Sequence, residues 1–102
     1  MKKIINGRKY NTDTAKEVGS WWNGVLANDL WYVRETLYVK KNGEFFLYGE
    51  GGAMTEYAQP PGMYDWCSGA AISPMTLNQA KEWAENKISS DEYEAVFGEV
   101  EE

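Results

Sequence analysis

The sequence predicts an α+β fold: a small antiparallel sheet built on a long central β-hairpin, with a short N-terminal helix and two C-terminal helices. Three observations support this prediction. Residues 31–52 alternate like two strands around a turn, residues 76–98 carry two helical patterns, and residues 12–17 contain a further helix-start signal. Because strands and helices occupy separate stretches, the helices are expected mainly on one face of the sheet.

The register of the central hairpin follows from its turn. Lys41-Asn42-Gly43 suits a three-residue connection in which Gly43 adopts the left-handed conformation. One face then carries only apolar side chains, those of Leu37, Val39, Phe45 and Leu47. The opposite face, called the aromatic face below, carries Thr36, Tyr38, Phe46 and Tyr48. Because a slip by one residue exchanges the two faces, we expect the apolar face to form the core and the aromatic face to be covered by a helix, a loop or a partner.

The N-terminal part is expected to hold a small hairpin followed by a short helix. Residues 4–10 flank an Asn-Gly pair, the sequence that favours a tight hairpin turn. Thr14 and Glu17 match a capping box. This pattern predicts a helix from about residue 13 to residue 18, ending at Gly19.

The C-terminal part is expected to hold the last strand and the two longer helices. Residues 70–73 read as a strand that ends before a proline. Thr76 and Gln79 match a second capping box, which begins a helix. Ser89 or Ser90 then begins another helix, with acidic residues in its first turn.

The composition describes an acidic chain whose charge is unevenly spread. Its 102 residues suit one domain, residues 1–102, whose acidic tail at 99–102 is expected to be frayed. The formal charge is −6, yet residues 1–41 hold eight Lys or Arg against four Asp or Glu. Residues 82–102 hold eight acids and one lysine. This distribution argues against nucleic-acid binding by the chain as a whole, and it favours a basic partner.

Several kinds of chemistry lack their usual residues. The chain has no histidine and a single cysteine, Cys67, so the commonest general base and a cysteine pair for zinc are missing. The glycine-rich segments match neither a phosphate-binding loop nor a dinucleotide fingerprint. We therefore expect no enzymatic activity, no metal and no cofactor. The chain has neither an apolar run of membrane-spanning length nor a signal peptide, and a single cysteine suits a reducing compartment, so we expect a cytoplasmic protein.

Three features are left that could carry recognition. Carboxylates three or four residues apart on a helix lie about 5–6 Å apart, comparable to phosphates along a nucleic-acid strand. The acids that could imitate phosphates in this way, or simply form a solvated helix face, are Glu82, Glu85, Asp91, Glu92 and Glu94. The second feature is an aromatic-rich set, Trp21, Trp22, Tyr57, Tyr64 and Trp66. The third is the turn at Glu50-Gly51-Gly52, where missing side chains permit close approach.

The aromatic set also has a purely structural interpretation. Neighbouring residues in an extended stretch point in opposite directions, so only one of Trp21 and Trp22 is expected to be buried. Residues 53–70 lack periodicity, with one helical turn expected near residues 54–58. This segment would either cover the aromatic face as a lid or form part of a recognition surface.

Three segments resemble a family of small acidic proteins carried by phages and conjugative elements of Gram-positive bacteria. They are IINGRKYNTDTAKEVGSW, ETLYVKKNGEFFLYGEGG and LNQAKEWAENKISSDEYEAVFGEVEE, which together cover well over half of the chain. The resemblance implies cargo of a mobile element, a setting that often includes anti-CRISPR and anti-restriction proteins. It implies no catalytic residue, because the family has no assigned chemistry.

Two hypotheses about function follow. The preferred one is a non-enzymatic anti-defence protein that binds and inhibits a nucleic-acid-binding immune effector, a CRISPR-Cas nuclease, in the bacterial cytoplasm. Its acidic helices would compete for a groove lined by Lys and Arg, and its aromatic side chains would anchor the contact. The alternative is an accessory module of a conjugative element that binds protein or single-stranded nucleic acid, with Trp21, Trp22 and Tyr38 as stacking platforms.

Overall fold

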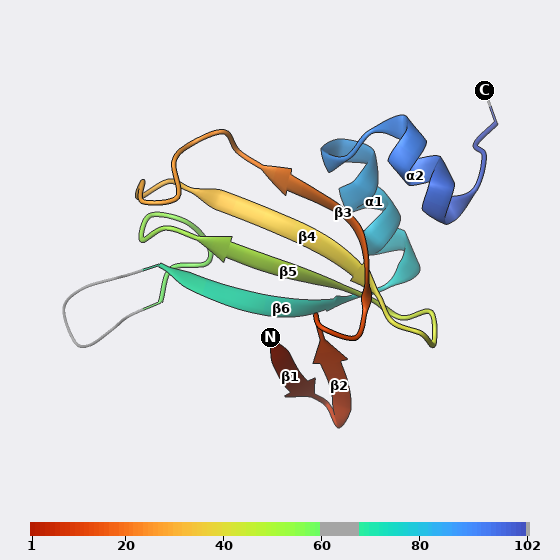
Figure 1. Ribbon diagram of the computed structural model, residues 1–102, viewed down its shortest axis with the longest axis horizontal. Helices are drawn as coiled ribbons and strands as arrows, with labels where there is room; N and C mark the ends of the chain where they lie inside the picture. Colours follow the sequence, from red (N-terminus) through yellow and green to blue (C-terminus); the bar gives the residue numbers. More distant parts are fainter. Residues whose placement is uncertain (60–67, 102) are drawn as a thin grey trace.

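Over residues 1–59 and 68–101, which the computed structural model describes, the chain forms two antiparallel sheets and two helices (Figure 1). The smaller sheet pairs β1 (Lys2–Ile5) with β2 (Arg8–Asn11). The larger sheet has its four strands side by side in chain order: β3 (Lys16–Trp22), β4 (Val33–Val39), β5 (Phe45–Gly51) and β6 (Gly69–Met75). The two helices that follow are α1 (Leu77–Lys87) and α2 (Ser90–Phe97).

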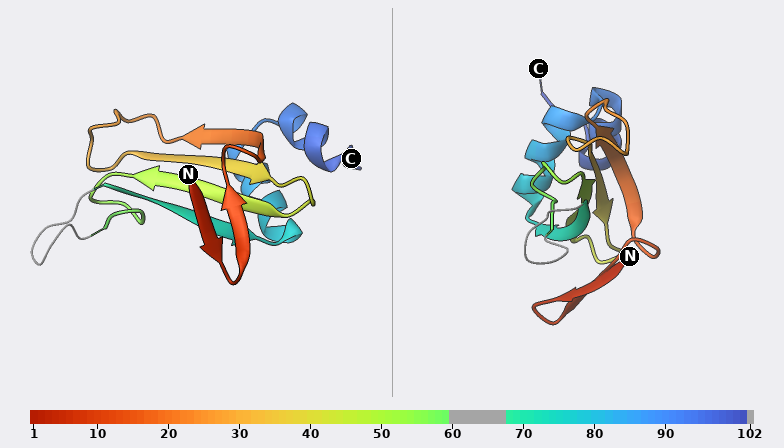
Figure 2. Two further views of the ribbon diagram at one scale, coloured as in Figure 1. Left: turned by 60° about the horizontal axis from the view of Figure 1, so that its bottom comes forward. Right: turned by 90° about the vertical axis from the view of Figure 1, so that its left-hand side faces the viewer.

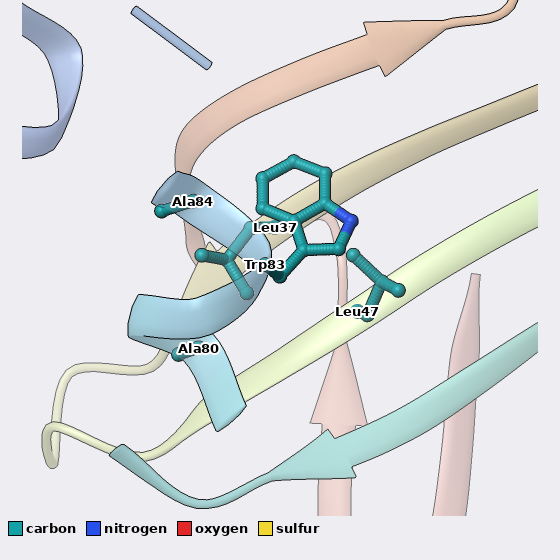
Figure 3. Close-up of a cluster of buried hydrophobic side chains, with 5 residues drawn as sticks. All are labelled: Leu37, Leu47, Ala80, Trp83 and Ala84. Atoms are coloured by element: carbon teal, nitrogen blue, oxygen red, sulfur yellow. The ribbon is translucent and has the colours of Figure 1, made fainter. Parts of the chain in front are cut away.

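The main core lies between α1 and one face of the larger sheet. Leu37 of β4 and Leu47 of β5 project from that face toward the helix (Figure 3). They meet Ala80, Trp83 and Ala84 on the inner side of α1. Because two of these helical residues are alanines, the helix backbone can lie close to the sheet, and the large indole fills the space beside it. This face was expected to form the core, and that expectation is confirmed.

Strands β4 and β5 pair in the register that the three-residue turn predicts. Val39 lies opposite Phe45 and Leu37 lies opposite Leu47. Gly43 has a φ of 89°, the left-handed conformation that the turn requires at its last position.

The predicted N-terminal helix is wrong. The side-chain oxygen of Asn11 accepts a hydrogen bond from the backbone N–H of Asp13 (2.9 Å), and its carbonyl accepts one from Ala15 (3.1 Å). These bonds close a single turn, after which the chain enters β3 at Lys16. A helix over residues 13–18 would gain few backbone hydrogen bonds for its nucleation cost, whereas β3 pairs with β4 along its length.

The predicted architecture, a small sheet built on one long hairpin over residues 31–52, is also wrong. Strands β4 and β5 are the two inner strands of a four-stranded sheet, and β1 and β2 form a second sheet. Sequence alternation shows which face of a strand is apolar, but it does not show which segments pair with the strand's edges. The fold is therefore richer in sheet than the sequence predicts.

Gly19, which resembles a helix end in the sequence, is a contact point inside β3. The pairing of β3 with β4 shifts register between Glu17 and Gly19. A Cβ atom on Gly19 would lie 2.8 Å from Cγ2 of Ile88, the residue directly after α1. The missing side chain thus lets the end of α1 approach the sheet.

The last strand is longer than predicted. Residues 70–73 lie in β6, but the strand continues through Pro74 to Met75. Proline has no backbone N–H to donate, which an edge strand tolerates because one of its sides is unpaired. Strand β6 is such an edge in the larger sheet.

The N-terminal hairpin covers one end of the aromatic face, on the opposite side of the larger sheet from α1 (Figure 2). Its turn has the predicted Asn-Gly geometry, with positive φ at Asn6 and Gly7. Tyr10, only 4% exposed, lies edge-on to Phe46 with ring centroids 5.5 Å apart. The aromatic face is therefore covered at this end by a part of the chain that the sequence did not suggest.

Both C-terminal helices begin as predicted. Thr76 accepts a hydrogen bond from the backbone of Gln79, whose side chain accepts one from the backbone of Thr76. Ser89 and Glu92 form the same reciprocal pair at the start of α2. These capping boxes satisfy N–H groups that a helix start leaves unpaired.

Residues 53–58 form consecutive turns instead of the expected helical turn. Thr55 donates from its N–H to the Gly52 carbonyl (3.2 Å), and Ala58 donates to that of Thr55 (3.1 Å). The described part of this segment covers the α1 side of the sheet, because Tyr57 lies against Gly49 of β5. The predicted lid over the aromatic face is thus wrong for these residues.

We expect Gly49→Ala to lower the free energy of unfolding by about 1–3 kcal/mol, because the added Cβ would occupy the place of the Tyr57 ring. Urea unfolding followed by circular dichroism measures the change. In a Tyr57→Ala background the same substitution should cost far less, because the ring is gone. An equal cost in both backgrounds would show that this contact is not the cause.

Candidate functional site

A buried carboxylate lies on the α1 side of the sheet. Glu35 of β4 is only 7% exposed, and it accepts a hydrogen bond from Nε1 of Trp83 at 3.0 Å. The hydroxyl of Tyr57 donates a second hydrogen bond to the same carboxylate. Burying a charged group is costly unless hydrogen bonds replace those it made with water. Tyr57, named above for recognition, therefore has its hydroxyl committed to the interior.

Tyr57 is held in its neutral form by this arrangement. Burial of its ring and hydroxyl raises the pKa of Tyr57 well above its usual range, and the hydrogen bond to the Glu35 carboxylate raises it further. Ionisation would place a phenolate beside a carboxylate, so the cluster requires the tyrosine to keep its proton.

The five predicted acidic residues all lie on the exposed surface of α1 and α2: Glu82, Glu85, Asp91, Glu92 and Glu94. In the described part of the chain none of them belongs to a salt bridge, and the carboxylate in the salt bridges there is that of Glu44. The two lysines of α1 lie over aromatic rings, with Nζ of Lys87 3.5 Å from the centre of the Trp21 ring and Nζ of Lys81 6.0 Å from that of Phe97. The acidic surface is thus not neutralised from within this part of the protein.

A groove of about 400 Å³ runs between the two helices. Glu85 of α1 and Glu94 of α2 line it together with Ile88, Tyr93 and Val100. Long basic side chains lay their alkyl stems on apolar surface and keep their charged ends at polar groups. The groove therefore has the chemistry to receive a Lys or Arg side chain.

Glu92 differs from the other predicted acids because the capping box uses its carboxylate. Its Oε1 accepts hydrogen bonds from the backbone N–H and the hydroxyl of Ser89, at 3.2 and 3.1 Å. Asp91 beside it lies in the first turn of α2, where the helix dipole favours a negative charge. Glu82, Glu85 and Glu94 have no such part in helix capping.

The two adjacent tryptophans lie on opposite faces of β3. Trp21 faces the α1 side, opposite Glu35 in the register, and packs against the core. Trp22 lies opposite Arg34 on the aromatic face and is 53% exposed. The prediction that one of the pair is buried holds only in part, because Trp21 is half-buried and Trp22 is exposed. The structure does not bring the two rings into one surface with Tyr57, and Tyr64, Trp66 and Cys67 lie outside the described residues.

Trp22 forms part of a pocket at the open end of the aromatic face. This pocket, of about 470 Å³, is lined by Trp22, Tyr32, Arg34 and the loop residues Val25 and Leu26, among others. Sequence reasoning missed Tyr32 and Arg34. Their spacing places them on the same face as Tyr38. Because the sequence did not predict β3, it gave no sign that Trp22 lies beside them.

The Glu50-Gly51-Gly52 segment is not an exposed turn. Glu50 belongs to β5 and accepts hydrogen bonds from the hydroxyls of Tyr32 (3.0 Å) and Tyr48 (3.4 Å). Gly51 and Gly52 are buried. A Cβ on Gly52 would lie 2.6 Å from the carbonyl oxygen of Leu30. The missing side chain therefore lets another part of this chain, and not a partner, approach the backbone closely.

Residues 1–59 and 68–101 contain no group of three or more His, Cys, Asp or Glu side chains arranged to hold a metal ion. In the same part of the chain no helix is both long and apolar enough to cross a membrane.

We expect Tyr57→Phe to lower the free energy of unfolding near neutral pH by about 1–3 kcal/mol, because Glu35 loses a donor while it stays buried. In the wild type the raised pKa of Tyr57 contributes to the stability of the fold, and this contribution is complete below a pH of about 10, the ordinary tyrosine pKa. This contribution falls as the pH rises further, because the unfolded chain ionises first.

Urea unfolding at about pH 9 and about pH 11 compares the two proteins, one value on each side of an ordinary tyrosine pKa. The variant should lose less stability over this interval than the wild type. Tyr93→Phe is the control, since its hydroxyl has no hydrogen-bond partner in the described residues. A loss in Tyr57→Phe as large as that in the wild type would contradict the assignment.

The chain matches no protein-family model, no curated protein and no solved structure.

Proposed function

We propose that this protein is a non-enzymatic inhibitor that binds a bacterial nucleic-acid-binding immune effector, a CRISPR-Cas nuclease, in the cytoplasm of the bacterial host. The observation that carries the proposal is the set of exposed carboxylates on α1 and α2 that no basic side chain of the described residues neutralises. The resemblance of three segments to proteins of phages and conjugative elements supplies the biological setting.

The acidic surface imitates a row of phosphates. Glu82 and Glu85 are three residues apart on α1, and Asp91 and Glu94 are three apart on α2. Carboxylates at this spacing lie about 5–6 Å from each other, so two such pairs form a short anionic track. A groove that binds nucleic acid through Lys and Arg would be occupied by this track, and the nucleic acid would be excluded.

The groove between α1 and α2 adds a specific contact to this general attraction. A basic side chain of the partner would lie on Ile88 and Tyr93 and place its charged end between Glu85 and Glu94. Such a contact removes apolar surface from water and pairs charge in one step, which is typical of the residues that dominate binding energy.

The charge distribution in the fold supports this orientation. The basic hairpin residues Lys2, Lys3, Arg8 and Lys9 lie in β1 and β2, on the opposite side of the larger sheet from α1. Their positive charge is therefore removed from the acidic helices, whose field stays negative toward a partner.

The test is a combined charge reversal, Glu82→Lys, Glu85→Lys and Glu94→Lys. It should weaken binding to a Cas9-type nuclease by at least about 100-fold, because like charges placed together across an interface cost several kcal/mol. Binding is measured by pull-down with titration, and inhibition by a cleavage assay at increasing protein. Glu92 is kept, because its loss would remove the α2 cap.

The control variant carries Asp13→Lys, Glu17→Lys and Glu56→Lys, three exposed acids outside the helices that give the same change in charge. It should bind and inhibit nearly as well as the wild type. Equal loss in both variants would mean that total charge, not the helical surface, is responsible. Inhibition that survives the helix reversal would refute phosphate mimicry.

A further inference from the structure

We propose that the pocket beside Trp22 binds a nucleotide, with the base stacked on the indole of Trp22 and the phosphate on the guanidinium of Arg34. The ligand is either free or one unit of a single strand. This site lies on the aromatic face, away from the acidic helices, and it goes beyond the inhibition proposed above.

The indole of Trp22 is held in place as a stacking surface. Its Nε1 donates a hydrogen bond to the carbonyl of Val25 at 2.7 Å, which attaches the following loop to the ring. Asn23 fastens the same loop at its other end, through a hydrogen bond to the carbonyl of Trp31 at 2.7 Å. Trp22 nevertheless remains 53% exposed, so its ring is both oriented and accessible. A fixed aromatic ring loses little freedom when a base stacks on it.

The guanidinium of Arg34 interacts with the hydroxyl of Tyr32, but no carboxylate of the described residues forms a salt bridge with it, so its positive charge can still attract an anion. Arg34 lies between Trp22 and Glu50 in the register of the sheet. The described part of the chain contains no salt bridge that involves Arg34, although Glu50 is its neighbour. The Glu50 carboxylate instead accepts hydrogen bonds from Tyr32 and Tyr48. Both oxygens of the Glu50 carboxylate are thus hydrogen-bonded to tyrosine hydroxyls.

The pocket fits a ligand that is flat and anionic. Trp22 and Arg34 are directly opposite each other on neighbouring strands, so a ring on one and an anionic group on the other can be held at once. Arg34 is the one charged side chain among the residues that line this pocket. The volume of the pocket, about 470 Å³, is within the ordinary range for small-ligand sites.

The surroundings of the pocket favour a nucleotide over other flat anions. The aromatic face continues from the pocket through Tyr48 and Tyr38 toward the N-terminal hairpin. That hairpin carries the exposed cations Lys2, Lys3 and Lys9, whereas its Arg8 forms a salt bridge with Glu44. A strand held at Trp22 and Arg34 would therefore meet further aromatic rings and then positive charge, the combination that single-strand binding uses.

The experiment titrates the full-length protein into a labelled oligothymidylate at low salt and follows fluorescence anisotropy. Unlabelled thymidine monophosphate is then added as a competitor. We expect the oligonucleotide to bind, and Trp22→Ala and Arg34→Gln each to weaken binding at least about fivefold, the lower end of what one stacked base contributes.

Matched controls separate the pocket from general aromatic and charge effects. Trp31→Ala removes another exposed indole, and Lys81→Gln removes a cation on α1, yet neither residue lines the pocket. Both controls should bind like the wild type. Competition by thymidine monophosphate assigns the site to nucleotides in general, and competition by the oligonucleotide alone assigns it to single strands.

The proposal is overturned if neither ligand binds, or if Trp31→Ala and Lys81→Gln weaken binding as much as the pocket variants do. Circular dichroism confirms that each variant is folded before it is compared. The charge reversal on α1 and α2 leaves this pocket intact. The pocket variants therefore test nucleotide binding, and the helix variant separately tests the inhibitor proposal.

Discussion

The carboxylate of Glu35 is held inside the protein by two neutral donors that come from distant parts of the chain. Trp83 reaches it from α1 and Tyr57 from the segment that follows β5. Since a buried carboxylate cannot lose its donors without a large cost in free energy, the helix and this segment are both tied to β4. The small residues nearby serve the same arrangement, because Gly49 leaves the space that the Tyr57 ring occupies.

This constraint gives the two faces of the larger sheet different properties. On the α1 side, the helix and residues 53–58 cover the apolar side chains and the buried carboxylate. On the aromatic side, the N-terminal hairpin covers only the end near Phe46, where Tyr10 packs. The other end carries Trp22, Arg34 and Tyr32 around a pocket. Trp22 thus lies on a different surface from the acidic residues predicted for recognition, although the sequence suggests one combined interface.

Much of the local structure could be predicted because its signals lie within a few residues. The register around Gly43 and the capping boxes at Thr76 and Ser89 depend on neighbouring residues alone. The identity of β3 could not be predicted, because its capping-box pattern is a local helix signal that pairing with β4 overrides. The pocket residues Tyr32 and Arg34 were missed for the same reason. The role of Tyr57 depends on Glu35, which precedes it by 22 residues, and no periodicity reports such a contact.

The separation of the basic hairpin from the acidic helices has a consequence for the kinetics of the proposed association. A protein that carries positive charge on one side of a sheet and negative charge on the other has a dipole moment as well as a net charge. In the field of the basic groove proposed above, this dipole would turn the molecule so that α1 and α2 lead during diffusion. Collisions with such a partner would then be productive more often than random orientation allows, and added salt would remove this advantage by slowing association more than it hastens dissociation.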